Sequence, residues 1–290
     1  MLLLAAILII LFLLYVTWTT RYRYPPANVP QALCYHKLST RFCLEGTWMT
    51  PRRFLSQIDY LVERGYRFIG EEDFFGAMDT RSDGNNRNLL LTFDDGYDAL
   101  CPVFLEHLVP RGIPVLVFLV TDYVGRENTW DLSLGRRPAT HLSWSQIVEM
   151  SRHGASFGSH GATHVDLTRA GPKKLEDEIA ESRRVIQERI GQNVRSFSYP
   201  FGRYNPVVSG VVEKAGYQGA FSLYPHHSNE RVDRYALRRN GVYVIDTNLT
   251  LEWKIKRGPF FWFEEMKCRT INSVAVLTPL FKKASRDQGK

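Results

Sequence analysis

Short apolar runs alternate with amphipathic segments along most of the chain. Pro51–Arg64 repeats apolar residues at helical spacing, with Thr50 placed as an N-cap and Gly65 as a stop. Pro114–Val120 is a continuous apolar run, as expected for a strand that is covered on both faces. Strand then helix, repeated about seven times, predicts a parallel sheet with helices outside it.

The other predicted elements follow from the same patterns. We expect strands at Ala32–Leu38, Tyr66–Ile69, Asn88–Phe93, Ala155–Ser159, Arg195–Tyr199, Gly219–Leu223 and Gly241–Ile245. We expect helices at Glu71–Met78, Tyr97–Val109, Trp144–Arg152, Pro172–Ile190 and Pro206–Ala215. Polar clusters fall at the ends of several strands, where barrel active sites are built, and no Gly-x-Gly-x-x-Gly follows the first strand. The pattern therefore favours a closed or distorted α/β barrel over an open Rossmann sheet.

The N-terminal segment Leu2–Trp18 is nearly unbroken apolar, which is just enough for a bilayer span of ~20 residues. It shows no clear cleavage site, so an uncleaved transmembrane helix is favoured over a signal peptide. We divide the chain into a membrane anchor (1–20), a linker (21–30), a barrel domain (31–246) and a basic-aromatic C-terminal extension (247–290). Two hypotheses are kept for the extension: it lies on a membrane surface, or it packs on the barrel and plugs its base.

Composition narrows the classes of molecule that the protein could bind. The net charge of +7 suits a protein near anionic lipid or glycan, and we find no basic helix or aromatic RNA motif that would indicate nucleic acid. The four cysteines form no Cys-x-x-Cys pair, which argues against a cysteine zinc site. Cys34 and Cys43 are close enough in sequence to form a disulfide in a secreted protein, but we favour separate buried thiols.

Two adjacent carboxylates, Asp94 and Asp95, follow a predicted apolar strand. Neighbouring carboxylates repel each other, so the pair is costly unless a cation or a shared proton offsets it. One metal ligand beside one general base is a natural division of roles. Taken alone, the motif fits equally a turn that caps the next helix.

Three more polar motifs end predicted strands. His160 and His164 are four residues apart and can face one point, which suits a divalent metal held by imidazoles and one carboxylate. Tyr199–Gly202 could line a sugar groove or offer a backbone N–H to an oxyanion, although an ordinary aromatic turn fits as well. His36 is a candidate general acid, with a structural histidine as the alternative.

Together these motifs resemble the polysaccharide deacetylase, or NodB-homology, family (carbohydrate esterase family 4). Thr92–Gly96 matches its first motif, and Ser159–His164 matches its second with Gly161 in place of serine or threonine. Tyr35-His36 and Tyr199–Gly202 are similar to the branch that de-N-acetylates poly-N-acetylglucosamine. The similarity runs from about Ala32 to Ile245, which is most of the chain.

The resemblance implies a distorted (β/α)7-type barrel and one divalent metal, usually zinc in this family. It implies Asp94 as general base, His36 as general acid, and a backbone N–H near Tyr199 for the oxyanion. The implied metal ligands are Asp95, His160 and His164, and the implied substrate-side residues are Tyr199, Pro200, Phe201, Trp144 and Arg239.

The sequence departs from the family at two places. An arginine that orients the base is often found in the third motif, but Tyr199 occupies that region here, and Arg238 or Arg239 would substitute from just before the last predicted strand. The late Leu-x-His motif is not clear in Leu223–His227. Trp144 and Trp130 would stack on sugar faces, with core packing as the alternative for Trp144.

We therefore expect a hydrolase of linear amide C–N bonds that removes N-acetyl groups from an amino-sugar polymer. Its catalytic domain would be membrane-anchored and extracytoplasmic, although Arg21 and Arg23 follow the apolar span and the positive-inside rule favours a cytoplasmic body. Two alternatives remain: a deacetylase or deformylase of a lipid-linked or small amino sugar, and a catalytically silent glycan-binding member of an export complex.

Overall fold

The computed structural model describes residues 29–40, 46–80, 86–130, 138–223 and 233–256, together with 10, 12, 261, 263–264 and 266–270. Within these ranges no helix has both the length and the apolar character needed to cross a bilayer. Most of the predicted anchor and linker lies outside the described residues, as do Cys43, His226 and His227. The anchor therefore stays a prediction, whereas Cys34 is a free, buried thiol, as the sequence analysis favours.

Seven parallel strands of the described chain close into a barrel. β1 pairs with both β5 and β10, and the order between them is β10-β9-β8-β7-β6-β5. These strands are β1 (Gln31–Tyr35), β5 (Asn88–Phe93), β6 (Leu116–Leu119), β7 (Ser156–Ser159), β8 (Ser196–Ser198), β9 (Gly219–Ser222) and β10 (Leu237–Gly241). β4 (Arg67–Phe68) pairs with the start of β5, while β2 (Lys37–Leu38) and β3 (Trp48–Met49) form a separate pair. The predicted α/β barrel is confirmed.

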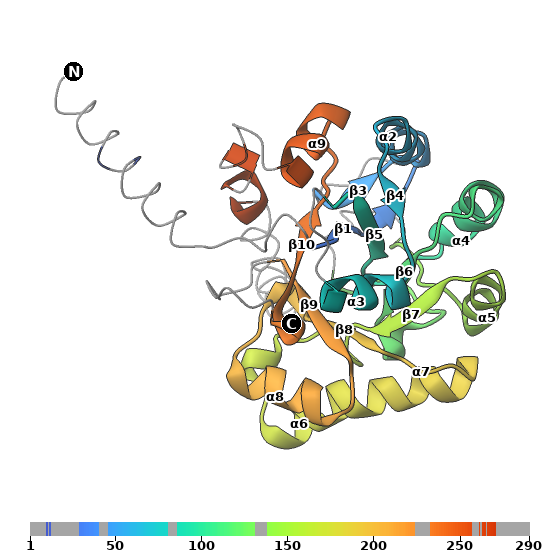
Figure 1. Cartoon of the computed structure of the whole chain (residues 1–290). Helices are drawn as coiled ribbons and strands as arrows, with labels where there is room; N and C mark the ends of the chain where they lie inside the picture. The colour runs from blue at the N-terminus through green and yellow to red at the C-terminus, as the bar shows by residue number, and fades with distance from the viewer. Residues whose placement is uncertain are drawn as a thin grey trace, which may run out of the picture.

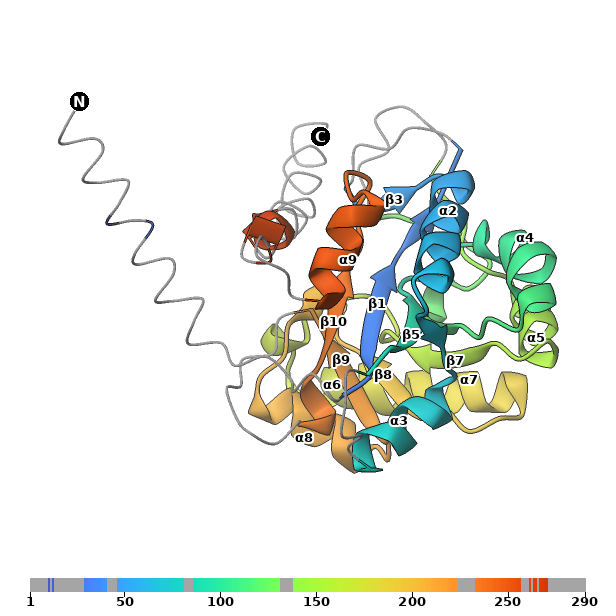
Figure 2. The same ribbon diagram turned by 45° about the horizontal axis from the view of Figure 1, so that its top comes forward.

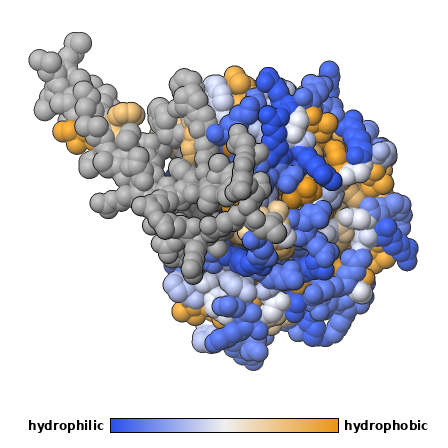
Figure 3. Space-filling view, in the orientation of Figure 1, coloured by the Kyte–Doolittle hydropathy of each residue, from blue (hydrophilic) through white to orange (hydrophobic). Residues whose placement is uncertain are grey.

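Helices surround this barrel (Figures 1 and 2). They are α2 (Pro51–Glu63), α3 (Glu71–Thr80), α4 (Leu100–Val103), α5 (Trp144–Arg152), α6 (Pro172–Glu176), α7 (Ser182–Ile190), α8 (Pro206–Lys214) and α9 (Asn248–Lys256). Thr50 is the N-cap that the sequence predicted, and its side chain accepts from the Arg53 N–H. Ser143 forms a capping box with Gln146 at the start of α5. The visible face in Figure 3 is mostly hydrophilic, as expected when helices turn their apolar sides inward.

Aromatic side chains close one end of the barrel. α3 crosses that end in Figure 1, and its Phe74 and Phe75 pack on Phe221 of β9, with ring centroids 5.7 and 6.4 Å apart. Phe118 of β6 lies 5.6 Å from the same Phe221 ring. The plug at the base is therefore α3. The first helix of the C-terminal extension, α9, packs against α2 instead, where Tyr60 donates to Glu252.

The sequence misplaced the last barrel strand. β10 spans Leu237–Gly241, whereas Gly241–Ile245 was predicted. Leu237, Arg239 and Gly241 are the buried positions of β10, and a buried arginine interrupts the apolar pattern by which strands are recognised. The predicted helix Pro172–Ile190 is also modified, because a π-helical turn at Asp177–Glu181 separates α6 from α7.

Glu71, at the start of α3, is a buried carboxyl at the plugged end. The residue is only 7% exposed, and burial raises its pKa from 4.5 to about 7, against the opposing effects of Ser196 and Arg195. The unfolded chain thus loses this proton at a lower pH than the folded chain. The free energy of unfolding should therefore fall as the pH rises from 4.5 to about 7.

Replacing Glu71 with glutamine should remove this dependence. At about pH 8 the variant should be more stable than the parent by up to about 3 kcal/mol, and at about pH 4 the two should be similar. Urea unfolding at both pH values measures the difference. Glu72→Gln, which removes the exposed neighbouring charge, is the matched control. Equal stability of Glu71→Gln and the parent at the higher pH would contradict the prediction.

Candidate active site

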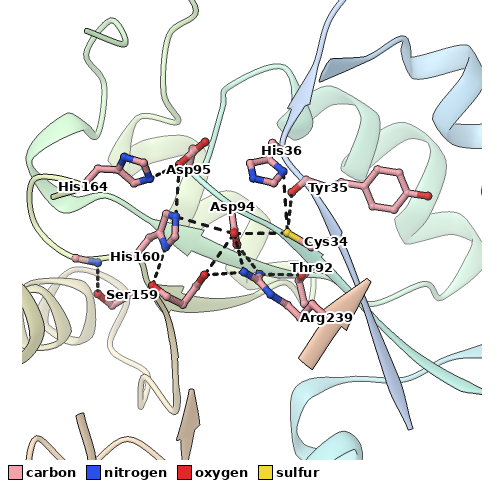
Figure 4. Close-up of polar contacts among 12 residues, drawn as sticks. Cys34, Tyr35, His36, Thr92, Asp94, Asp95, Ser159, His160, His164 and Arg239 are labelled. Atoms are coloured by element: carbon pink, nitrogen blue, oxygen red, sulfur yellow. Dashed lines mark hydrogen bonds and ion pairs between the residues drawn. The ribbon is translucent and has the colours of Figure 1, made fainter. Parts of the chain in front are cut away.

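Polar side chains from five strands meet at the carboxyl end of the barrel, opposite the α3 plug (Figure 4). Asp94 and Asp95 follow β5, and His160 follows β7. Parallel strands point their carboxyl ends to the same side, so motifs far apart in sequence become neighbours there. Cys34 and His36 lie at the end of β1, Ser198 ends β8, and Arg239 reaches in from β10.

Asp95, His160 and His164 form one cluster whose ligand atoms all lie within 4.8 Å of one another. Asp95 Oδ1 is 3.6 Å from His160 Nε2 and 3.5 Å from His164 Nε2. His160 Nδ1 is 2.7 Å from the Ser198 carbonyl oxygen, which can only accept, so Nδ1 carries the proton and Nε2 offers its lone pair. The three residues therefore fit a divalent cation with two imidazoles and one carboxylate.

Burial also favours the protonation states that a metal needs. It lowers the pKa of His160, and it lowers the pKa of His164 well below the ordinary value, with the nearby His160 acting in the same direction. Both imidazoles are therefore held neutral, which is the form that binds metal.

Asp94 is held by a buried arginine. Arg239 donates from Nη1 to Oδ1 at 2.6 Å and from Nη2 to Oδ2 at 2.7 Å, and the Ser198 hydroxyl donates to Oδ2 at 3.3 Å. Below this pair, the Arg239 guanidinium lies over the rings of Phe118 and Phe221, 5.2 and 5.8 Å from their centroids. The Arg239–Asp94 ion pair thus lies directly on the aromatic rings inside the barrel.

Arg239 determines the protonation state of Asp94. Burial alone would raise the pKa of Asp94, but the charge of Arg239 and its hydrogen bonds lower it well below its usual range. Asp94 therefore stays ionised, with both oxygens oriented. Cys34 and His36 also lie near Asp94 and could be grouped with it as metal ligands, but the guanidinium on both Asp94 oxygens would repel a cation there.

Backbone strain gathers at this end of the barrel. Among the described non-glycine residues, positive φ angles occur at Asp95 (67°), His164 (57°) and Phe201 (59°). Such conformations are costly for these residues and persist at functional sites, where the surroundings impose them. Each of the three comes from a different motif of the candidate site.

The same motifs are found in known proteins. A family model described as polysaccharide deacetylase matches residues 81–220, which include Asp94, Asp95 and both histidines. This match identifies a polysaccharide deacetylase domain over residues 81–220. The Bacillus subtilis protein YxkH is 27% identical over 214 residues, covering 74% of this chain and 71% of that protein. A poly-beta-1,6-N-acetyl-D-glucosamine N-deacetylase of Staphylococcus epidermidis is 26% identical over 226 residues, or 73% of each chain.

Solved structures show the same fold. The Streptococcus pyogenes deacetylase PplD superposes with a TM-score of 0.65 at 20% identity, over 79% of this chain and 99% of that one. IcaB from Ammonifex degensii gives a TM-score of 0.61 at 23% identity, over 89% and 99% of the two chains. The polysaccharide deacetylase barrel therefore extends beyond the segment that the family model matches.

The oxyanion donor was predicted to be a backbone N–H near Tyr199, and the N–H of Tyr199 itself is already bonded. Its N–H donates to the Phe221 carbonyl at 3.0 Å, and its buried hydroxyl donates to the Tyr235 carbonyl. Pro200 has no N–H, and the N–H of Gly202 donates back to Tyr199. Within this turn, the N–H of Phe201 is left as the candidate donor, and the Phe201 ring lies 4.7 Å from His164.

The two tryptophans have different surroundings in this polysaccharide deacetylase domain. Trp130 stacks on His164 with ring centroids 4.5 Å apart, so it forms a wall of the site and one of its faces is taken. Trp144 is partly buried against the core, and the Arg189 guanidinium covers its ring at 5.5 Å. These contacts favour core packing, the alternative kept for Trp144 in the sequence analysis.

His36 is half-buried, and its Nδ1 is 4.0 Å from Cys34 Sγ, which in turn lies 3.5 Å from Asp94. His36 therefore lies on the Asp94 side of the candidate site. Sequence reasoning missed Ser198 and His141, which contacts the Asp95 carbonyl at 2.7 Å. The inward position of Ser198 at the end of a predicted strand was a usable signal, whereas His141 follows a loop and gave none.

Proposed function

We propose that this chain is a metal-dependent N-deacetylase acting on an amino-sugar polysaccharide of the poly-N-acetylglucosamine kind. One observation carries the proposal: a three-ligand cluster, Asp95, His160 and His164, lies directly beside a carboxylate, Asp94, that an arginine keeps ionised. A candidate metal site and a candidate general base, the two functions needed for amide hydrolysis, therefore lie side by side. The substrate class is supported by the Staphylococcus epidermidis relative named above.

The cluster would hold a single divalent cation, which we take to be zinc because neutral imidazoles and one carboxylate suit it. When bound, such an ion polarises a carbonyl and lowers the pKa of water from about 15.7 towards neutrality. Three protein ligands leave coordination positions open for these roles, as in catalytic zinc sites.

The chain's own residues would divide the proton transfers. Asp94 accepts the proton of the attacking water, and Arg239 keeps that carboxylate in place through both oxygens. The N–H of Phe201 donates to the oxyanion of the former amide carbonyl. His36, on the Asp94 side of the centre, donates the proton that the departing sugar amine requires.

The first test uses the full-length protein in detergent. We expect it to contain bound metal and to release acetate from N-acetylglucosamine oligomers, and we expect a chelator to stop this release until zinc is returned. Acetate release is measured by a coupled assay and metal content by elemental analysis. Bound metal without release would point to a lipid-linked or small amino sugar as substrate. Absence of both would sink the proposal and favour the silent glycan-binding alternative.

We also propose that the N-terminal apolar segment anchors the protein as a single span with the barrel outside the cytoplasm. Support comes from the unbroken run Leu2–Trp18 and from the polymeric substrate proposed above. The charges of Arg21 and Arg23 oppose this orientation. Digestion of the barrel by protease added to intact cells would support it, and complete protection would overturn it.

A further inference from the structure

The loop of residues 160–164, which we call the histidine loop, carries two of the three candidate metal ligands. It leaves the barrel at the end of β7 and adopts two left-handed conformations, Gly161 at φ 84° and His164 at φ 57°. Its carbonyls at Gly161 and Ala162 accept from the N–H groups of Thr121 and Asp122, at 3.2 and 3.0 Å. One side of the loop is thus tied to the segment after β6.

A single buried glutamate, Glu178, holds the other side. Its Oε2 accepts from the N–H of Ala162 at 2.7 Å and from that of Thr163 at 2.8 Å, and its Oε1 accepts from the Thr163 hydroxyl. Lys174 supplies a charged contact, at 2.7 Å. A buried carboxylate is costly unless it is fully paired, and three of its four partners belong to the histidine loop.

Glu178 remains ionised in this position. Burial would raise the pKa of Glu178, but hydrogen bonds from Lys174 and Thr163 outweigh it and lower the pKa below its ordinary value. The carboxylate therefore presents acceptors alone, which is what two backbone N–H groups and a hydroxyl need.

A π-helical turn places Glu178. The turn covers Asp177–Glu181 in the middle of the long helical segment, and π turns within α-helices are frequent at functional sites. Ser182 Oγ donates to the carbonyl of Glu178, and it also lies 2.7 Å from Ser159 Oγ, which accepts from the Gly161 N–H. The same turn therefore reaches both the start and the middle of the histidine loop.

Gly161 is matched to this arrangement. A Cβ at Gly161 would lie 2.9 Å from Glu178 Oε2, and its φ of 84° is strained for any other residue. The glycine at this position therefore lets the carboxylate approach the loop backbone. Glu178 contacts none of the ligand atoms, so any influence on a metal must pass through the backbone.

We propose that Glu178 is a positioning residue of the metal centre: it holds the histidine loop in the shape that turns His160 and His164 towards Asp95. This role rests on the metal-binding function proposed above. Residues that orient metal ligands typically contribute roughly 10–100-fold to metal affinity. Glu178→Ala should therefore weaken zinc binding by about that factor.

The test compares three variants of the full-length protein with the parent. Zinc affinity is measured by competition with a chromophoric chelator, and amide exchange of Ala162 and Thr163 is measured without metal. Glu178→Ala should lose affinity and exchange both amides faster. Glu178→Gln should restore most of both, because its side-chain carbonyl can still accept from the two N–H groups. Glu71→Ala, which removes a buried carboxyl at the plugged end, should change neither.

Two results would overturn the role of Glu178. One is a Glu178→Ala variant that binds zinc and protects both amides as the parent does. The other is an equal loss in Glu71→Ala, which would make the effect one of general stability. If the parent itself bound no zinc, the proposed metal centre would be wrong. Amide exchange would then test Glu178 separately, because unchanged exchange in Glu178→Ala would show that Glu178 does not hold the loop.

Discussion

Replacing Asp94 with asparagine is expected to lower the turnover of N-acetylglucosamine oligomers by roughly 10²–10⁴-fold, the usual contribution of a general base. Asparagine keeps the shape of the side chain but cannot take a proton from water. The cluster of Asp95, His160 and His164 is left intact, so bound metal should stay near the parent level. Acetate release at saturating substrate and metal content are measured on the same preparation.

Two control variants show whether the loss of turnover is specific to Asp94. Asp98→Asn alters a half-buried acid on the same segment, away from the cluster, and should keep turnover within about two-fold of the parent. Asp95→Ala should lose the metal as well as the activity, since it removes a ligand. Full activity in Asp94→Asn, with the folded fraction verified by circular dichroism, would show that another group is the base.

Arg239→Met is expected to lower the free energy of unfolding by about 3–5 kcal/mol, because it leaves the Asp94 carboxylate buried without its charged partner. The arginine itself is 2% exposed and bonds both oxygens of Asp94. Methionine fills much of the same space over Phe118 and Phe221, so the loss should come from the charge rather than from a cavity. Urea unfolding followed by tryptophan fluorescence measures it.

The neighbouring arginine provides the control. Arg238 is half-buried on the other side of β10, and Arg238→Met should cost far less than Arg239→Met. The double variant Asp94→Asn/Arg239→Met should lose less stability than the sum of the two single variants, because each single variant leaves one lone buried charge and the double variant leaves none. Additive losses would mean that the pair contributes nothing as a pair.

The motifs at strand ends could be read from the sequence because they depend on local patterns. The bounds of Asn88–Phe93 and Trp144–Arg152 match the structure, since an apolar run and a capped amphipathic stretch each define an element without outside help. Placing the polar residues at the ends of parallel strands was then enough to bring Asp95 near His160.

What the sequence could not supply depends on contacts between distant segments. The resemblance left Arg238 and Arg239 open as the arginine that orients Asp94, and only the fold selects Arg239, which lies beside Asp94 although 145 positions separate them. From the sequence alone, the N–H of Tyr199 looks available to an oxyanion, but in the structure it donates to a carbonyl of β9. Glu178 is one acid among several on an amphipathic helix, and only the fold shows that the histidine loop rests on it.

The position of Arg239 in the last barrel strand has a consequence for how the protein is made. A chain that has emerged only as far as β9 carries every candidate metal ligand and Asp94, but not the guanidinium that neutralises Asp94. Contacts between such distant segments form late in folding. The Asp94 carboxylate therefore has no settled place until β10 inserts between β9 and β1, so closure of the barrel and completion of the candidate site coincide in one step.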